Sequence, residues 1–265
     1  SLADPERTGR LAEVGLTPLP VVGIPDWRSA LLAAAFTLPW LAWLARGRLR
    51  SRWLWLALAL AALLFPLAIA LVQVPLQSAL GALWNGLLDR PTIQRYLLAL
   101  PSLLVASAVQ ETAKLAMAIV GLRLSGERSD AAAGLPFGAA AGAGFGGFEA
   151  FWVFNQVFAV GWSFAMVQLQ GPLAALPFVE RFFTVPFHVA SAALAGYGYA
   201  TGRPWRYWLL AVALHTVANY AAVMTQAGLL SPIATEVWIG VVAAFTFGGA
   251  AWLQRRTARK SLPAA

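Results

Sequence analysis

The sequence predicts an all-α polytopic membrane protein, a helical bundle of about seven transmembrane helices without a soluble domain. Hydrophobic residues make up 60% of the 265 residues and charged residues only 11%, whereas soluble domains carry about 25% charged residues. The apolar residues occur in runs of about 20, the length at which an α-helix crosses roughly 30 Å of hydrocarbon. Composition and run length therefore place the chain in a lipid bilayer.

The first three predicted spans are divided by a basic loop and by a longer polar segment. Residues 27–45 form the first span, which ends where four arginines follow within 46–52. Residues 53–73 form the second span. The segment 75–96 is too polar to span, so we expect an outer loop with one short interfacial helix there. Residues 97–122 form the third span.

Four further spans complete the predicted bundle. The fourth, residues 131–160, is rich in glycine, and a longer segment with several polar residues separates it from the fifth, residues 182–201. A short loop with two arginines leads into the sixth span, residues 207–226. The seventh covers residues 237–253 and runs into a basic tail.

The distribution of lysine and arginine predicts the orientation of the bundle. Twelve of these residues fall in the loops 46–52, 123–130 and 202–206 and in the tail, and six fall on the other side. By the positive-inside rule the tail, residues 254–265, is cytoplasmic and the N-terminus lies outside. We expect a polar extracytoplasmic segment at 1–26, a membrane bundle at 27–253 and a multi-pass location in the cell membrane. Because residue 1 is a serine, we also expect that an upstream segment was removed or omitted.

Composition also excludes several classes of function. The chain has no cysteine, which removes disulfides, thiolate catalysis and cysteine metal sites. The net charge of +8 is explained by membrane topology, so we expect no nucleic-acid partner. The expected partners are the lipid bilayer and a membrane-protein or peptide substrate.

Charged residues inside the third and fourth spans require an explanation. Each costs roughly 2.5–3.5 kcal/mol at the centre of a membrane helix unless it meets a partner or water. Glu111 and Lys114 are three residues apart, so they share a helix face and can pair. An ion pair that only orients two helices explains them equally well. Glu149 follows glycines at 134, 138, 142 and 146, a ridge that lets a neighbouring helix approach closely.

The only two histidines of the chain lie in the fifth and sixth spans. Pro186 removes a helical hydrogen bond close to His188 and can open room there for water or substrate. His215 and Asn219 are four residues apart on one face and suit either metal ligation or stabilisation of an oxyanion. Each group alone is also explained as a bridge between helices. Because four consecutive spans each bring a polar group to mid-membrane, we expect one shared polar centre.

The ordered motifs QETAK, GFGGFEA, PFHVASAALAGYG and LHTVANY resemble the superfamily of glutamate-dependent intramembrane proteases. This superfamily includes the CAAX prenyl proteases, the PrsW-type proteases and the YhfC-type membrane peptidases, and the pattern is closest to the last two. The resemblance covers about residues 97–226. It implies an intramembrane endopeptidase that cleaves a membrane-embedded or membrane-proximal substrate.

Position by position, the resemblance assigns roles to six residues. Glu111 matches the second glutamate of the first motif and Lys114 its basic partner, while Glu149 matches the acidic residue of the next span. His188 matches the lone histidine. The resemblance implies that a glutamate, helped by a histidine, activates water. The final motif, His215 and Asn219, would stabilise the oxyanion.

The resemblance also leaves two questions open. Some relatives are described as metalloproteases, and His188, His215 and Glu149 would supply three ligands for zinc. The first glutamate of the family pair is Gln110 here, and glutamine cannot act as a base. Either Glu111 or Glu149 performs that role, or the chain is a non-catalytic scaffold that binds a partner's membrane helix. A proton-coupled transporter is a third hypothesis, because buried acids and histidines also form proton relays.

Overall fold

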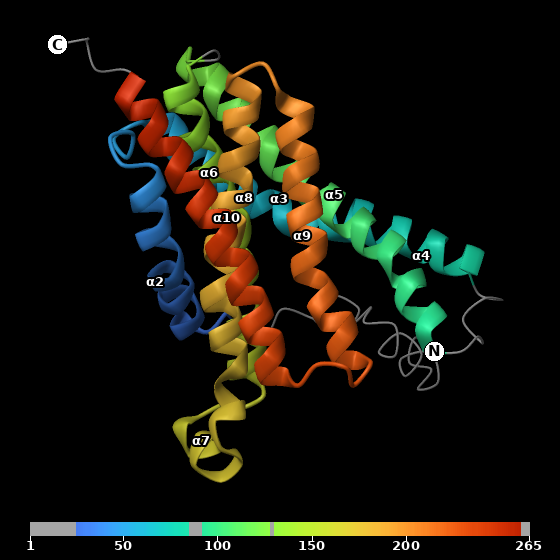
Figure 1. Cartoon of the computed structure of the whole chain (residues 1–265). Helices are drawn as coiled ribbons and strands as arrows, with labels where there is room; N and C mark the ends of the chain where they lie inside the picture. The colour runs from blue at the N-terminus through green and yellow to red at the C-terminus, as the bar shows by residue number, and fades with distance from the viewer. Residues whose placement is uncertain (1–24, 85–91, 128–129, 261–265) are drawn as a thin grey trace.

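The computed structural model describes residues 25–84, 92–127 and 130–260, and within them the chain forms a bundle of long helices without β-strands (Figure 1). Residues 85–91 of the predicted outer loop (75–96), most of the N-terminal segment and the last five residues lie outside the described residues. The helices are α2 (Trp27–Leu44), α3 (Arg52–Ala68), the π-helix η1 (Ile69–Gln73), α4 (Val74–Trp84), α5 (Thr92–Ser125), α6 (Ala131–Ala159), α7 (Phe164–Gln170), the 3₁₀ helix η2 (Pro172–Ala175), α8 (Leu176–Ala200), α9 (Pro204–Gln226) and α10 (Pro232–Lys260).

The fold is that of a membrane helical bundle. Five helical stretches of the described chain are long and apolar enough to cross a bilayer, and the bent pair α6 and α7 would make a sixth. The first predicted span does form a helix, α2. It is not among these stretches, because its 18 residues include Arg28, Pro39 and three tryptophans. Among the described residues, at most six of the seven predicted spans therefore have the length and composition of a membrane helix.

Helix boundaries follow the local sequence. Asp130 caps α6 by accepting a hydrogen bond from the Ala132 amide at 2.8 Å. Proline occupies the first position of α9 and α10, where its missing N–H costs nothing. Several boundaries differ from prediction. α8 starts six residues earlier than expected, and α5 and α10 each start five residues earlier. α10 also continues to Lys260, so much of the expected basic tail is helical.

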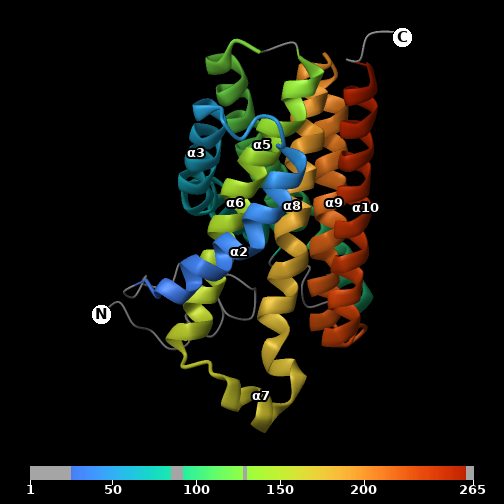
Figure 2. The ribbon, with the colours of Figure 1, turned by 90° about the vertical axis from the view of Figure 1, so that its left-hand side faces the viewer.

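The glycine-rich helix α6 lies at the centre of the bundle, against α2, α3, α5 and α8 (Figure 2). A Cβ at Gly138 or Gly142 would collide with the α8 backbone at Ala192 or His188. On another face, a Cβ at Gly144 would collide with the backbone of α3. The predicted small-residue ridge therefore allows α6 and α8 to approach to backbone contact.

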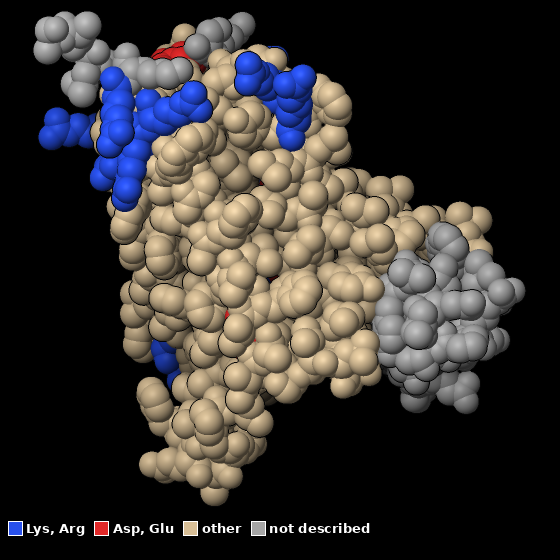
Figure 3. All heavy atoms as spheres, in the orientation of Figure 1, with Lys and Arg blue, Asp and Glu red and all other residues tan. Residues whose placement is uncertain are grey.

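The predicted basic loops lie at one end of the bundle. Arg48 of the α2–α3 loop forms ion pairs with Glu127 and Asp130 of the α5–α6 connection. Gln254 near the end of α10 donates to the Leu44 carbonyl at 2.9 Å, which joins the C-terminal helix to the same end. Figure 3 shows most of the visible lysine and arginine gathered there.

One part of the chain leaves the main bundle. Helix α3 continues through the π-helix η1 into α4, which packs on η1 and α5 and projects sideways with the start of α5 (Figure 1). The short helix expected within residues 75–96 is therefore present, but it continues α3 rather than standing alone in a loop. The π-turn widens the helix at Gln73.

Candidate active site

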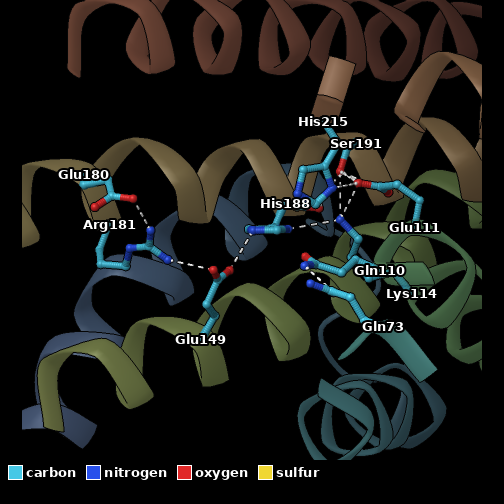
Figure 4. Close-up of polar contacts among 10 residues, drawn as sticks. All are labelled: Gln73, Gln110, Glu111, Lys114, Glu149, Glu180, Arg181, His188, Ser191 and His215. Carbon is cyan, nitrogen blue, oxygen red and sulfur yellow. Dashed lines mark hydrogen bonds and ion pairs between the residues drawn. The ribbon is translucent and has the colours of Figure 1, made fainter. Parts of the chain in front are cut away.

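Polar side chains from α5, α6, α8 and α9 meet inside the bundle (Figure 4). The innermost pair is the predicted one: Lys114 Nζ lies 2.6 Å from Glu111 Oε1, and both side chains are 0% exposed. Two ions so placed depend on each other, because the loss of either would leave an uncompensated charge buried in the membrane protein. This pair forms the buried end of the site.

Glu111 is also held by two groups from other helices. His215 Nδ1 of α9 lies 2.8 Å from Glu111 Oε1. A carboxylate only accepts, so Nδ1 donates its proton, and a ring with a single proton then has its lone pair on Nε2. Ser191 of α8 donates to both Glu111 oxygens at 3.2 and 3.3 Å and accepts from Lys114 at 3.2 Å. The sequence did not single out Ser191, although it lies one helical turn after His188.

His188 connects this buried pair to Glu149. Lys114 Nζ lies 3.0 Å from His188 Nδ1, and His188 Nε2 lies 2.8 Å from Glu149 Oε2. An ammonium has no acceptor, so Nδ1 accepts and the ring proton lies on Nε2, the nitrogen beside Glu149. Gly146 makes this contact possible, because a Cβ there would come within 2.8 Å of His188 Cβ.

Arg181 holds Glu149 from the opposite side. Its Nη1 lies 2.9 Å from Glu149 Oε1, and its Nη2 lies 2.5 Å from Glu180 Oε1. Arg181 is one of the six basic residues that charge counting places on the outer side, and the structure shows in addition that it is 6% exposed and contacts the site. Arg181 precedes His188 by seven residues, two helical turns, and this spacing is the signal that would have revealed it.

A cavity of about 80 Å³ lies beside these groups. A buried water needs roughly 10–15 Å³ of such space, so several waters fit. Glu149 keeps 24% of its side chain exposed, in contrast to Glu111. The polar residues lining the cavity include Gln110, Glu149, Arg181, Thr184, His188, His215 and Asn219.

The donor geometry does not fit the zinc site considered from the sequence. Among the residues that the structure describes, no three His, Asp or Glu side chains are placed to hold a metal ion. Both ring nitrogens of His188 already contact protein groups, Lys114 and Glu149. We therefore derive no step through a metal.

The structure brings all six predicted residues into one region. Glu111, Lys114, His188 and His215 are joined by direct contacts, Glu149 contacts His188, and Asn219 lines the same cavity. Gln110 does not contact Glu111 through its amide nitrogen, which donates to Gln73 Oε1 at 3.0 Å. The two glutamates thus occupy different environments, one sealed and one beside the cavity.

Comparison with known proteins adds no identification. No protein-family model, no curated protein and no solved structure matches the chain.

Proposed function

We propose that the chain is an intramembrane endopeptidase that hydrolyses a peptide bond of a membrane-embedded or membrane-proximal substrate. The observation that carries the proposal is the pairing of Glu149 with His188 at 2.8 Å beside a cavity large enough for water. Hydrolysis needs a base within reach of water. Glu149 supports the proposal because it is partly exposed and lines a cavity with room for water.

Glu149 serves as the base and Glu111 as a structural anchor in this mechanism. Glu111 has no exposed surface and faces Lys114, His215 and Ser191. Glu149 is partly exposed and lines the cavity, and its Oε1 keeps a second lone pair beyond the contact with Arg181, whereas Oε2 beside His188 is buried. A cavity water can therefore approach Glu149 and not Glu111.

In the proposed reaction, Glu149 takes a proton from a cavity water as the water oxygen bonds to the peptide carbonyl carbon. The His215 Nε2 lone pair accepts the other water hydrogen and orients the nucleophile. The Asn219 amide donates to the oxyanion that forms. The proton then passes from Glu149 to the amide nitrogen, the C–N bond breaks, and an acid and an amine leave.

We also propose a multi-pass location in the cell membrane with the basic end, and hence the C-terminus, in the cytoplasm. The ion pairs of Arg48 and the hydrogen bond of Gln254 support this orientation, because they gather the predicted cytoplasmic loops at one end. Positive charge flanking membrane helices is retained on the cytoplasmic side.

The test uses the full chain reconstituted in lipid vesicles with two probes, fluorescein-labelled casein and a single-span model peptide. We expect cleavage by the wild type and a loss of about 10²–10⁴-fold in Glu149→Gln, the usual contribution of a general base. Glu127→Gln, at the basic end of the bundle, is the matched control and should cleave normally. Cleavage in H₂¹⁸O should place one heavy oxygen in the new carboxyl group.

A non-catalytic scaffold is the second candidate. Its support is the double engagement of Glu149 by Arg181 and His188, which resembles a closed structural network. Wild-type protein that cleaves neither probe, together with tight retention of the uncut peptide, would favour the scaffold. Cleavage that persists undiminished in Glu149→Gln would refute the assignment of the base.

A further inference from the structure

A line of glutamine side chains runs from the cavity toward the projecting helix α4. Gln110 Nε2 donates to Gln73 Oε1 at 3.0 Å, and Gln73 Nε2 donates to Gln77 Oε1 at 3.3 Å. Gln77 Nε2 then donates to the Ser102 carbonyl at 3.1 Å and to its hydroxyl at 3.0 Å. Every amide in the line points the same way, from the cavity to α5 beside α4.

The line ends at the cavity with an acceptor atom that has no hydrogen-bond partner in the described structure. This atom is Oε1 of Gln110, which is 8% exposed and lines the cavity. A buried acceptor without a donor costs roughly 1–3 kcal/mol. A group that supplies an N–H at this point would remove that cost.

The far end of the line lies at the membrane-facing surface. Gln73 and Gln77 are half-buried, and their neighbours Leu71 and Leu76 are 70% and 47% exposed. The π-helix η1 ends at Gln73, and α4 projects from the bundle beyond it. The line therefore joins a lipid-facing edge to the cavity that holds Glu149.

A peptide bond inside a membrane helix is hydrogen-bonded within the helix and hidden from attack. To expose it, the substrate must unwind, and each freed backbone N–H or C=O then needs a partner, because lipid supplies none. A side-chain amide offers both a donor and an acceptor at its tip. A row of such amides therefore suits an extended peptide of any sequence.

We infer that Gln73, Gln77 and Gln110 form a binding strip for the backbone of an unwound substrate segment, which passes from the lipid beside α4 to Glu149. The inference rests on the proposed protease function and specifies how the substrate is held. A purely structural bridge from η1 and α4 to α5 would leave the unpartnered Gln110 Oε1 at the cavity unexplained. These glutamines are positioning residues and take no part in bond breaking.

The first test does not depend on cleavage. Because the chain has no cysteine, single cysteines can be placed in Glu149→Gln protein at Leu76, beside the strip, or at Val241, a 64% exposed position on α10. The probe is a synthetic leucine–alanine transmembrane peptide with one central cysteine, oxidised with copper phenanthroline in phosphatidylcholine vesicles. We expect disulfide formation at Leu76→Cys to exceed that at Val241→Cys.

Removing one amide should weaken the preference. Gln77→Leu should lower the yield at position 76 about fivefold, the equivalent of one hydrogen bond. Gln77→Asn keeps an amide on a shorter side chain and should lower it less, which keeps the test valid if Gln77→Leu folds poorly. Gln226→Leu, exposed at the end of α9, is the matched control. Equal disulfide yields at both cysteines, or a yield at position 76 that does not change in Gln77→Leu, would overturn the inference.

The second test uses a single-span peptide that the wild type cleaves. Gln77→Leu should raise KM about fivefold and leave kcat nearly unchanged, because the strip holds substrate away from the reacting bond. A fall in kcat with KM unchanged would contradict the inference. If the wild type cleaves no peptide, the protease proposal fails, while the cross-linking result still decides whether the strip binds peptide.

Discussion

Removing Lys114 tests whether the buried pair anchors the bundle. The Lys114 ammonium contacts Glu111 at 2.6 Å, His188 at 3.0 Å and Ser191 at 3.2 Å, and it is 0% exposed. Lys114→Met keeps the length of the side chain but leaves the Glu111 carboxylate without its cation. Loss of one partner of a buried pair costs roughly 3–5 kcal/mol. We expect a loss of unfolding free energy of that size in detergent micelles.

The double variant separates the charge from the packing. Glu111→Gln combined with Lys114→Met removes both charges and leaves an amide oxygen that can still accept from His215. Its loss of unfolding free energy should be well below the sum of the losses in the two single variants, because neither charge remains uncompensated. It should also retain measurable cleavage if Glu149 is the base. Additive single losses, or a Lys114→Met loss below about 1 kcal/mol, would refute this account of the pair.

Two further predictions concern packing and topology. Gly142→Ala should cost about 1–3 kcal/mol in unfolding free energy, because its Cβ would meet the His188 backbone, whereas Gly248→Ala on the open face of α10 should not destabilise; equal effects would refute backbone contact between α6 and α8. A membrane-impermeant maleimide should label Gln170→Cys on intact cells and Arg50→Cys only after permeabilisation, and the reverse pattern would invert the proposed orientation.

The membrane helices were predictable because bilayer thickness imposes a length that apolar runs reveal. The predicted sixth span ends at Gln226, where α9 ends. The predicted second span is too short, because the helix continues past Gln73 and the apolar stretch runs to Leu83. The predicted first span forms α2, but proline, arginine and tryptophan reduce its apolar character. Hydropathy predicts the position of a helix better than it predicts whether that helix crosses the bilayer.

The candidate site was predictable where the sequence contains rare residues. Two histidines and three charged residues in apolar runs had few places to find partners except each other. Ser191 and Arg181 were missed for opposite reasons. A serine in a membrane helix is common and carries no signal, and Arg181 near a helix end is also explained as an interfacial anchor. Only the packing of α8 against α6 shows that both face inward.

The contacts of Gln110 change the interpretation of this residue. In the sequence it stands where the resembled superfamily has a glutamate, and this difference favours a scaffold without activity. In the structure its amide donates to Gln73, and an ionised glutamate at 110 could not do so, because a carboxylate only accepts. A glutamine at this position therefore matches the glutamine that faces it. Glu149 and His188 contact each other and line the cavity independently of residue 110. A glutamine at position 110 therefore leaves in place every group that the proposed hydrolysis needs.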